Sequence, residues 1–101
     1  MANLRFAEEV ADDLVQALAW YDERSTTLGD RFRTEVQAVF NGVKAAPLQY
    51  PFASTELQVR FAKVKRFPYL VLFHIRHETP TILGVRHGAG DPEVWKRRAE
   101  S

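Results

Sequence analysis

The segment Tyr69–Ile75 most restricts the fold of this chain, because it is apolar on both faces of a strand. Its sequence, Tyr-Leu-Val-Leu-Phe-His-Ile, is interrupted by a single polar residue, His74. Successive side chains of a strand point to opposite faces, so a strand with one face in water alternates apolar and polar residues. We predict a strand over Tyr69–Arg76 that needs an apolar cover on each face.

Two amphipathic helices are predicted before this strand, and they supply one cover. Apolar residues recur at three- and four-residue steps over Ala7–Tyr21 and again over Phe32–Val43. The turn-prone stretch Ser25–Asp30 separates them, and Pro47 ends the second helix near Ala45–Ala46, because it disfavours helical geometry in the preceding residue. The two helices form an antiparallel hairpin with one apolar side. The acidic residues expected on the solvent face of the first helix are Glu8, Glu9, Asp12 and Asp13.

Other strands are predicted at both ends of the chain. Asn3–Phe6 alternates around two apolar residues and is expected to open the fold as a strand. After an irregular connector, Pro47–Gln58, the alternation over Arg60–Phe67 predicts a second strand, and Thr81–His87 is a further β-type run. The turn between the apolar strand and the last one is expected at His77–Pro80.

A short helix is predicted to close the chain. Gly88–Gly90 ends the sheet, Asp91 is suited to the N-cap, and Pro92 to the first helical position. The basic stretch from Glu93 to about Ala99 follows. The sequence therefore predicts an α+β fold over residues 1–101 as one domain, with an N-terminal strand, an antiparallel helix hairpin packed on a small, mostly antiparallel sheet, and a short C-terminal helix.

The second cover of the apolar strand is open to two interpretations. The C-terminal helix shields part of that face, with Trp95 as its anchor, and a helix from a partner protein shields the rest. Alternatively, the C-terminal helix and the connector are sufficient. An exposed apolar groove would mark an interaction site.

Charge is unevenly distributed along the chain, although its net value is only +1. Residues 1–59 carry five basic and nine acidic side chains, and residues 60–101 carry nine basic and four acidic ones. This asymmetry suggests an anionic partner for the C-terminal part, or an ordinary solvated face. Cysteine is absent, which excludes disulfides and thiolate metal sites. Without a signal-peptide pattern or an apolar run of membrane-spanning length, we expect a soluble, cytoplasmic protein.

No zinc, P-loop or dinucleotide pattern is present, so the sequence predicts neither a metal nor a cofactor. Lys63 and Lys65 share one face of their strand, and Arg86 and His87 end another. A nuclease that works without metal needs cations for the phosphate and groups that transfer protons, and these side chains are suitable. The alternative is that the lysine pair only marks a solvent-exposed face of the strand, where such pairs are common. Trp95 has two interpretations as well, a ring that stacks on a base or a packing anchor.

Several short motifs, in this order and spacing, resemble the RelE/ParE superfamily of toxins. Similarity to its helix hairpin and exit comes from Trp20-Tyr21, Leu28–Phe32 and Pro47 with Tyr50-Pro51. Similarity to its central strand comes from Arg66–Phe73. Similarity to its C-terminal signature comes from Val85–Gly88 with Asp91-Pro92, Trp95 and Arg97 or Arg98. The resemblance covers Leu4 to about Arg98. It implies a toxin of a type II toxin–antitoxin (plasmid stabilisation) system that forms a hetero-oligomer with a cognate antitoxin.

The resemblance implies two different targets, since RelE-like members cleave messenger RNA on the ribosome and ParE-like members inhibit DNA gyrase. The chain departs from the ribonuclease pattern at Leu70, where that pattern has arginine, at Ala89-Gly90, where it often has two arginines, and at Trp95, where it has tyrosine. A lost guanidinium removes a bidentate phosphate contact that neighbouring groups rarely replace. The departures favour a gyrase inhibitor. The alternatives are a ribosome-dependent endoribonuclease, for which the resemblance implies catalysis by Lys63, Lys65, Arg86 and His87, and a non-toxic antitoxin-binding module.

Two contact surfaces complete the expectations. The predicted contacts to the target are Arg66, Trp95, Lys96, Arg97 and Arg98. The predicted contacts to the antitoxin are Leu70, Leu72 and His74.

Overall fold

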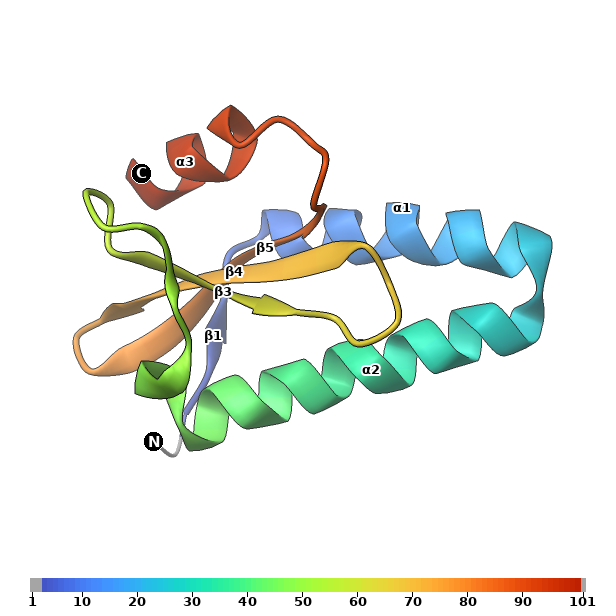
Figure 1. Ribbon diagram of the computed structural model, residues 1–101, viewed down its shortest axis with the longest axis horizontal. Helices are drawn as coiled ribbons and strands as arrows, with labels where there is room; N and C mark the ends of the chain where they lie inside the picture. Colours follow the sequence, from blue (N-terminus) through green and yellow to red (C-terminus); the bar gives the residue numbers. More distant parts are fainter. Residues whose placement is uncertain (1–2, 101) are drawn as a thin grey trace.

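The computed structural model describes residues 3–100, which form a five-stranded sheet with helices on both of its faces (Figure 1). The strand order is β1-β5-β4-β3-β2, with β1 parallel to β5 and all other neighbours antiparallel. In chain order the elements are β1 (Arg5–Phe6), α1 (Glu9–Arg24), α2 (Thr26–Ala45), the 3-10 helix η1 (Pro47–Gln49), β2 (Phe52–Ser54), β3 (Val59–Lys63), β4 (Tyr69–Arg76), β5 (Thr79–His87) and α3 (Glu93–Glu100). The predicted α+β architecture is confirmed.

The two long helices form the predicted antiparallel hairpin, but the break between them is shorter than expected. Only Ser25 leaves the helical conformation, and the stretch predicted as a turn is already the first part of α2. The Ser25 hydroxyl accepts a hydrogen bond from Leu28 N at 3.4 Å and so serves as the N-cap of α2. Polar residues that suit a turn also suit a helix start, which explains the error. The predicted end near Ala45 is correct.

The hairpin of β4 and β5 turns on two residues rather than four. Arg76 pairs with Thr79, which leaves His77 and Glu78 as the loop, with φ values of 52° and 64°. Positive φ at both positions is typical of the two-residue turn whose twist matches the strands. Pro80 is therefore not in the turn but in β5, where it is buried.

The connector before β3 contains a strand that the sequence did not predict. Phe52 pairs with Arg60, and Ser54 with Val59, so β2 forms an outer strand of the sheet. Three residues interrupted by a register shift give no readable alternation, which is why the pattern was missed. β3 also ends at Lys63, earlier than the predicted Phe67.

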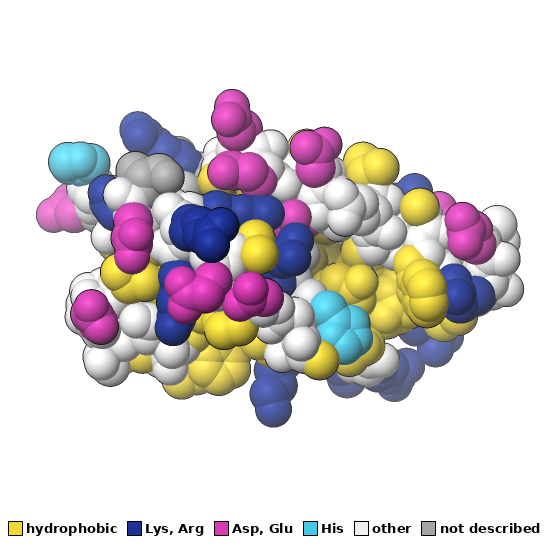
Figure 2. Space-filling model, turned by 90° about the horizontal axis from the view of Figure 1, so that it is seen from above, with side chains coloured by type: hydrophobic (Ala, Val, Ile, Leu, Met, Phe, Trp, Pro, Cys, Tyr) yellow, Lys and Arg dark blue, Asp and Glu magenta, His cyan; other side chains and the backbone are white. Residues whose placement is uncertain are grey.

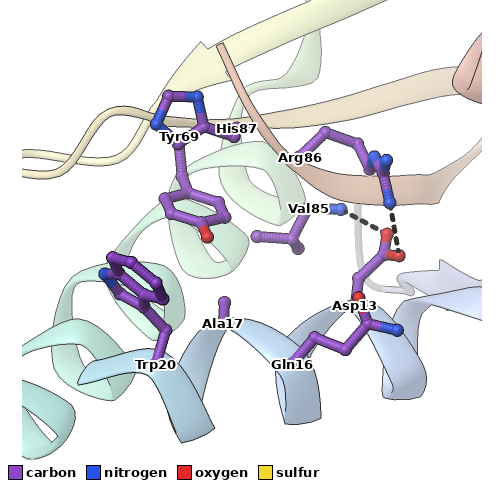
Figure 3. A pocket seen from close by; sticks show the side chains of 8 residues that line it. All are labelled: Asp13, Gln16, Ala17, Trp20, Tyr69, Val85, Arg86 and His87. Atoms are coloured by element: carbon purple, nitrogen blue, oxygen red, sulfur yellow. Dashed lines mark hydrogen bonds and ion pairs between the residues drawn. The ribbon is translucent and has the colours of Figure 1, made fainter. Parts of the chain in front are cut away.

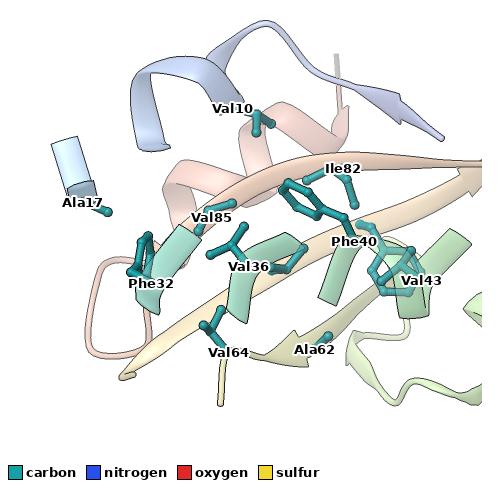
Figure 4. Close-up of a cluster of buried hydrophobic side chains, with 12 residues drawn as sticks. Val10, Ala17, Phe32, Val36, Phe40, Val43, Ala62, Val64, Ile82 and Val85 are labelled. Carbon is teal, nitrogen blue, oxygen red and sulfur yellow. The ribbon is translucent and has the colours of Figure 1, made fainter. Parts of the chain in front are cut away.

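The larger hydrophobic core lies between the helix hairpin and the sheet (Figure 4). Phe32, Val36 and Phe40 of α2 face Val71 and Phe73 of β4 in this core. A ring cluster closes one end of it: Tyr21, Phe32, Phe67 and Tyr69. This layer is the predicted first cover of the apolar strand.

The second face of β4 is covered by the chain's own C-terminal helix. Leu72 of β4 and Leu83 of β5 are buried together with Trp95 and Ala99 of α3. Figure 1 shows α3 above the sheet, on the opposite side from α2. The expectation that another protein must complete this cover is therefore wrong, and the alternative, a cover from within the chain, is correct. None of the helices between residues 3 and 100 has the length and apolarity needed to cross a membrane.

Candidate functional site

The structure brings three of the four predicted catalytic residues to one cleft. Lys63 at the end of β3, Lys65 just after it, and His87 at the end of β5 line a cleft of about 600 Å³. Arg66 and Leu70 line the same cleft. Both lysines are exposed, because the alternation along β3 turns Ala62 and Val64 into the core and the lysines outward. We call this space the lysine cleft.

The fourth predicted catalytic residue, Arg86, does not line the lysine cleft. Its Nη1 lies 3.3 Å from Oδ1 of Asp13 on α1. Two of the candidate arginine positions are therefore not available to the lysine cleft: β4 contributes the apolar Leu70, and the guanidinium of Arg86 on β5 is directed to Asp13. The cleft therefore receives no arginine from β4 or β5.

Asp13 is the functional candidate that the sequence analysis missed. It was expected on the solvent face of α1, but its side chain is only 4 % exposed. Its Oδ2 accepts hydrogen bonds from Arg98 Nη1 at 2.7 Å and from Val85 N at 3.0 Å, and its Oδ1 accepts from Arg98 Nη2 at 3.1 Å and from Arg86 Nη1. The signal was present in the helix period, because Asp13 follows the buried Val10 by three residues and precedes the buried Ala17 by four.

A glycine makes room for this ion pair. A Cβ atom at Gly84 would lie 2.7 Å from Arg98 Nη1 and 3.1 Å from Asp13 Oδ2. Arg98 also donates to the carbonyl oxygen of Leu83 at 3.0 Å. The hydrogen bond to Asp13 raises the pKa of Arg98, and burial opposes that shift.

The C-terminal helix is thus fixed to the sheet by polar as well as apolar contacts. Arg76 Nη2 donates to the carbonyl oxygen of Ala99 at 2.9 Å, near the end of α3. At its start, Asp91 Oδ1 accepts from Glu93 N at 3.0 Å, which confirms the predicted N-cap. Together with Arg98, these contacts hold α3 over Leu72.

This arrangement changes how the predicted antitoxin contacts are placed. Leu72 is 1 % exposed and His74 is 8 % exposed, both beneath the chain's own structure, whereas Leu70 is partly exposed. In place of a long open groove, Leu70 and Leu72 line a small pocket of about 190 Å³ beside Trp95 of α3, and His74 is not part of its lining. Nδ1 of His74 has no hydrogen-bond partner. Burial lowers the pKa of His74, and the nearby Arg76 lowers it further.

The predicted target contacts fall into two groups. Trp95 is 8 % exposed and Arg98 is engaged with Asp13, so the structure uses both as packing and anchoring residues of α3. A Trp95 ring stacked on a base would need an exposed face that it lacks here. Arg66 and Arg97 are exposed, and Lys96 lies 3.8 Å from Glu93 in an ion pair. Within residues 3–100 no group of three or more metal-ligating side chains is present.

Comparisons with known proteins identify this arrangement of elements. The family model described as the ParE toxin of the type II toxin–antitoxin system parDE matches residues 4–92. Among solved structures, a chain of the chromosomal ParDE toxin–antitoxin system from P. aeruginosa is similar, with a TM-score of 0.67 and 17 % identity, and the match covers 86 % of this chain and 96 % of that one. No curated protein matches the sequence. The chain therefore belongs to the ParE toxin family of type II toxin–antitoxin systems.

Proposed function

We propose that this toxin arrests growth by inhibiting DNA gyrase in the cytoplasm and is silenced by a cognate antitoxin. The observation that carries the choice of target is the composition of the lysine cleft. A metal-free ribonuclease must stabilise charge that develops on the scissile phosphate, and guanidinium groups do so best. Here β4 presents Leu70 and Arg86 is bound to Asp13, so among the described residues that line the cleft only Arg66, from the loop between β3 and β4, carries a guanidinium.

The test is induced expression of the chain with and without its neighbouring antitoxin gene. Gyrase inhibition predicts growth arrest with DNA damage and intact messages, together with loss of supercoiling when the purified toxin is added to gyrase. Cleaved messages with unaffected supercoiling would reject the proposal. Rescue of growth by the neighbouring gene tests the antitoxin part separately.

A ribosome-dependent endoribonuclease is the second candidate, because Lys63, Lys65 and His87 do line one cleft. Two exposed lysines and an imidazole can bind a phosphate and transfer a proton. A third candidate, a non-toxic module that binds only the antitoxin, predicts no arrest in the induced cells.

Contact with the antitoxin at Leu70, Leu72 and His74 remains part of the proposal, with one structural condition. Leu70 is accessible as the chain stands, but an antitoxin segment reaches Leu72 and His74 only if α3 leaves its place on the sheet. Deuterium exchange of the α3 amides with and without antitoxin distinguishes contact at Leu70 alone from contact that displaces α3. Exchange that becomes faster in the complex indicates displacement of α3, and unchanged or slower exchange indicates contact at Leu70 alone.

A further inference from the structure

A second cleft lies between α1 and the ends of β4 and β5, beside the lysine cleft, with which it shares Tyr69 and His87. Its volume is about 270 Å³. Ala17 and Val85 form the floor, Trp20 and Tyr69 the walls, and Arg86 and His87 the rim (Figure 3). Figure 2 looks onto this side of the molecule, where a hollow with hydrophobic side chains opens beside a histidine. We call this space the Trp20 cleft.

Two of the polar groups at the Trp20 cleft, the Tyr69 hydroxyl and the His87 ring, can donate a hydrogen bond to a ligand. Within residues 3–100 the Tyr69 hydroxyl has no hydrogen-bond partner, and in Figure 3 it points into the cleft. Burial raises the pKa of Tyr69 above its ordinary value of 10, so the phenol is a hydrogen-bond donor at neutral pH. His87 Nδ1 accepts from Ala89 N at 3.0 Å, so the neutral ring carries its hydrogen on Nε2.

Arg86 adds a positive charge that is not fully neutralised. Asp13 carries one negative charge and is shared by two guanidinium groups, those of Arg86 and Arg98. Arg98 uses both terminal nitrogens on Asp13, whereas Arg86 uses one, and its side chain is 29 % exposed. The four donors around Asp13 occupy both of its oxygens, so it offers little to a ligand. The cleft therefore suits an anionic acceptor.

The walls of the cleft are aromatic and held in position. The Arg24 guanidinium lies 3.3 Å from the Trp20 ring centroid and donates to the Trp20 carbonyl oxygen at 2.6 Å. Tyr69 packs against Phe32 and His87 with ring centroids 5.2 and 5.4 Å away. Trp20 is nevertheless 54 % exposed, a large apolar surface beside a cation. Such a pair fits a ligand that presents a charge next to an apolar group.

The surroundings favour a single carboxylate over a nucleic acid strand. The stripe of α1 that carries Asp13, Gln16 and Trp20 continues into Glu9 at one end and Glu23 at the other, with Asp12 beside it. A nucleic acid backbone that crossed the cleft would be repelled by these carboxylates along its length. A single acidic side chain that enters the cleft stays away from them.

We propose that the Trp20 cleft binds an aspartate or glutamate side chain of the antitoxin, with its carboxylate on Arg86 and Tyr69 and an adjacent apolar side chain against Trp20. The inference rests on the proposed function, in which the chain is held by an antitoxin. It assigns part of that interface to the side of the toxin between α1 and β5, next to the lysine cleft, with which the Trp20 cleft shares Tyr69 and His87, and it requires no movement of α3.

The experiment measures the dissociation constant of the full toxin for the polypeptide encoded by the adjacent antitoxin gene. Tyr69→Phe removes only the hydroxyl and should weaken binding about threefold or more, and Arg86→Gln should weaken it about tenfold or more. Trp20→Ala should also weaken it. Matched controls at other surfaces, Tyr50→Phe, Arg31→Gln and Val15→Ala, should bind as the unchanged toxin does. Circular dichroism confirms that each variant is folded.

A charge exchange identifies the partner residue. The toxin variant Arg86→Glu should lose binding, and one Asp→Arg or Glu→Arg substitution in the antitoxin should restore it. If the unchanged toxin binds the antitoxin but Tyr69→Phe, Trp20→Ala and Arg86→Gln bind equally well, the cleft is not part of the interface, and the inference fails while the proposed function stands. No binding by the unchanged toxin would reject the proposed function itself. Binding of a labelled 12-nucleotide single-stranded RNA that is lost in Arg86→Gln would overturn the choice of a protein carboxylate.

Discussion

Arg98 on α3 donates two hydrogen bonds to the carboxylate of Asp13 on α1, at 2.7 and 3.1 Å, and so joins helices that cover opposite faces of the sheet. Both side chains are nearly buried, with exposed fractions of 12 % and 4 %. A buried ion pair is not strongly stabilising in itself, but removal of one partner leaves the other charge buried and uncompensated.

Asp13→Ala should therefore reduce the free energy of unfolding by about 3 kcal/mol or more. Urea denaturation followed by circular dichroism measures the change. Asp12→Ala, one residue away and exposed, should change it by less than about 0.5 kcal/mol. Equal effects of the two substitutions would contradict the anchoring role of Asp13.

Gly84→Ala should lower stability by about 1–2 kcal/mol, because its Cβ would displace the Arg98 guanidinium from Asp13. The same substitution in an Arg98→Ala background should cost less, since the 2.7 Å contact is then absent and the 3.1 Å contact with Asp13 Oδ2 remains. The comparison is a double-mutant cycle on thermal or urea unfolding. An undiminished cost in that background would indicate a different cause.

Stability should fall as the pH is lowered below about 6.5, because of His74. Burial places the folded-state pKa of His74 below its ordinary value of 6.5, so the unfolded chain binds the proton first on acidification. This loss of unfolding free energy is absent above pH 6.5 and grows as the pH falls toward the folded-state pKa. The free energy of unfolding changes by at most about 1.4 kcal/mol per pH unit from this one group. Urea unfolding between pH 5 and 8 should show this slope in the natural chain and in His77→Gln, and a reduced slope in His74→Leu.

The two tryptophans should respond differently to alanine. Trp95→Ala should cost about 3–5 kcal/mol, because the ring is packed between α3 and the sheet. Trp20→Ala should cost less than about 1 kcal/mol, since its ring is half exposed. Chemical denaturation of both variants tests the ordering. A mild effect at Trp95 would mean that α3 contributes little to the fold.

Growth arrest should survive the double substitution Lys65→Ala, His87→Ala, because gyrase inhibition does not require proton transfer in the lysine cleft. Colony counts after induction, with Lys44→Ala as a control on α2, measure the effect. Loss of killing by a folded double variant would support the ribonuclease instead.

Much of the fold could be predicted from the sequence because its main signals are local. The apolar strand has the predicted bounds, Tyr69–Arg76, and Pro47 ends α2 where expected. The missed strand β2 is too short to show alternation. Ser25 illustrates a different difficulty, since a capping residue and a turn residue have the same chemistry.

The site was less predictable because its contacts join distant parts of the chain. Asp13, Arg86 and Arg98 meet only after α1, β5 and α3 are assembled, and sequence spacing carries no such information. The cover of Leu72 by Trp95 depends in the same way on the path of the loop before α3. The lysine pair was predictable, because its exposure follows from the period of one strand.

The hydrogen bonds from Val85 N to Asp13 and from Arg98 to the Leu83 carbonyl oxygen have a consequence for solubility. β1 pairs with only two residues of β5, Thr81 and Ile82. The backbone N–H and C=O groups of β5 beyond these residues could otherwise pair with a strand from another copy of the chain. The side chains of Asp13 and Arg98 already bond to two of these backbone groups and so hinder the pairing of a further strand. A toxin released from its complex should therefore not polymerise by strand pairing along this edge of β5.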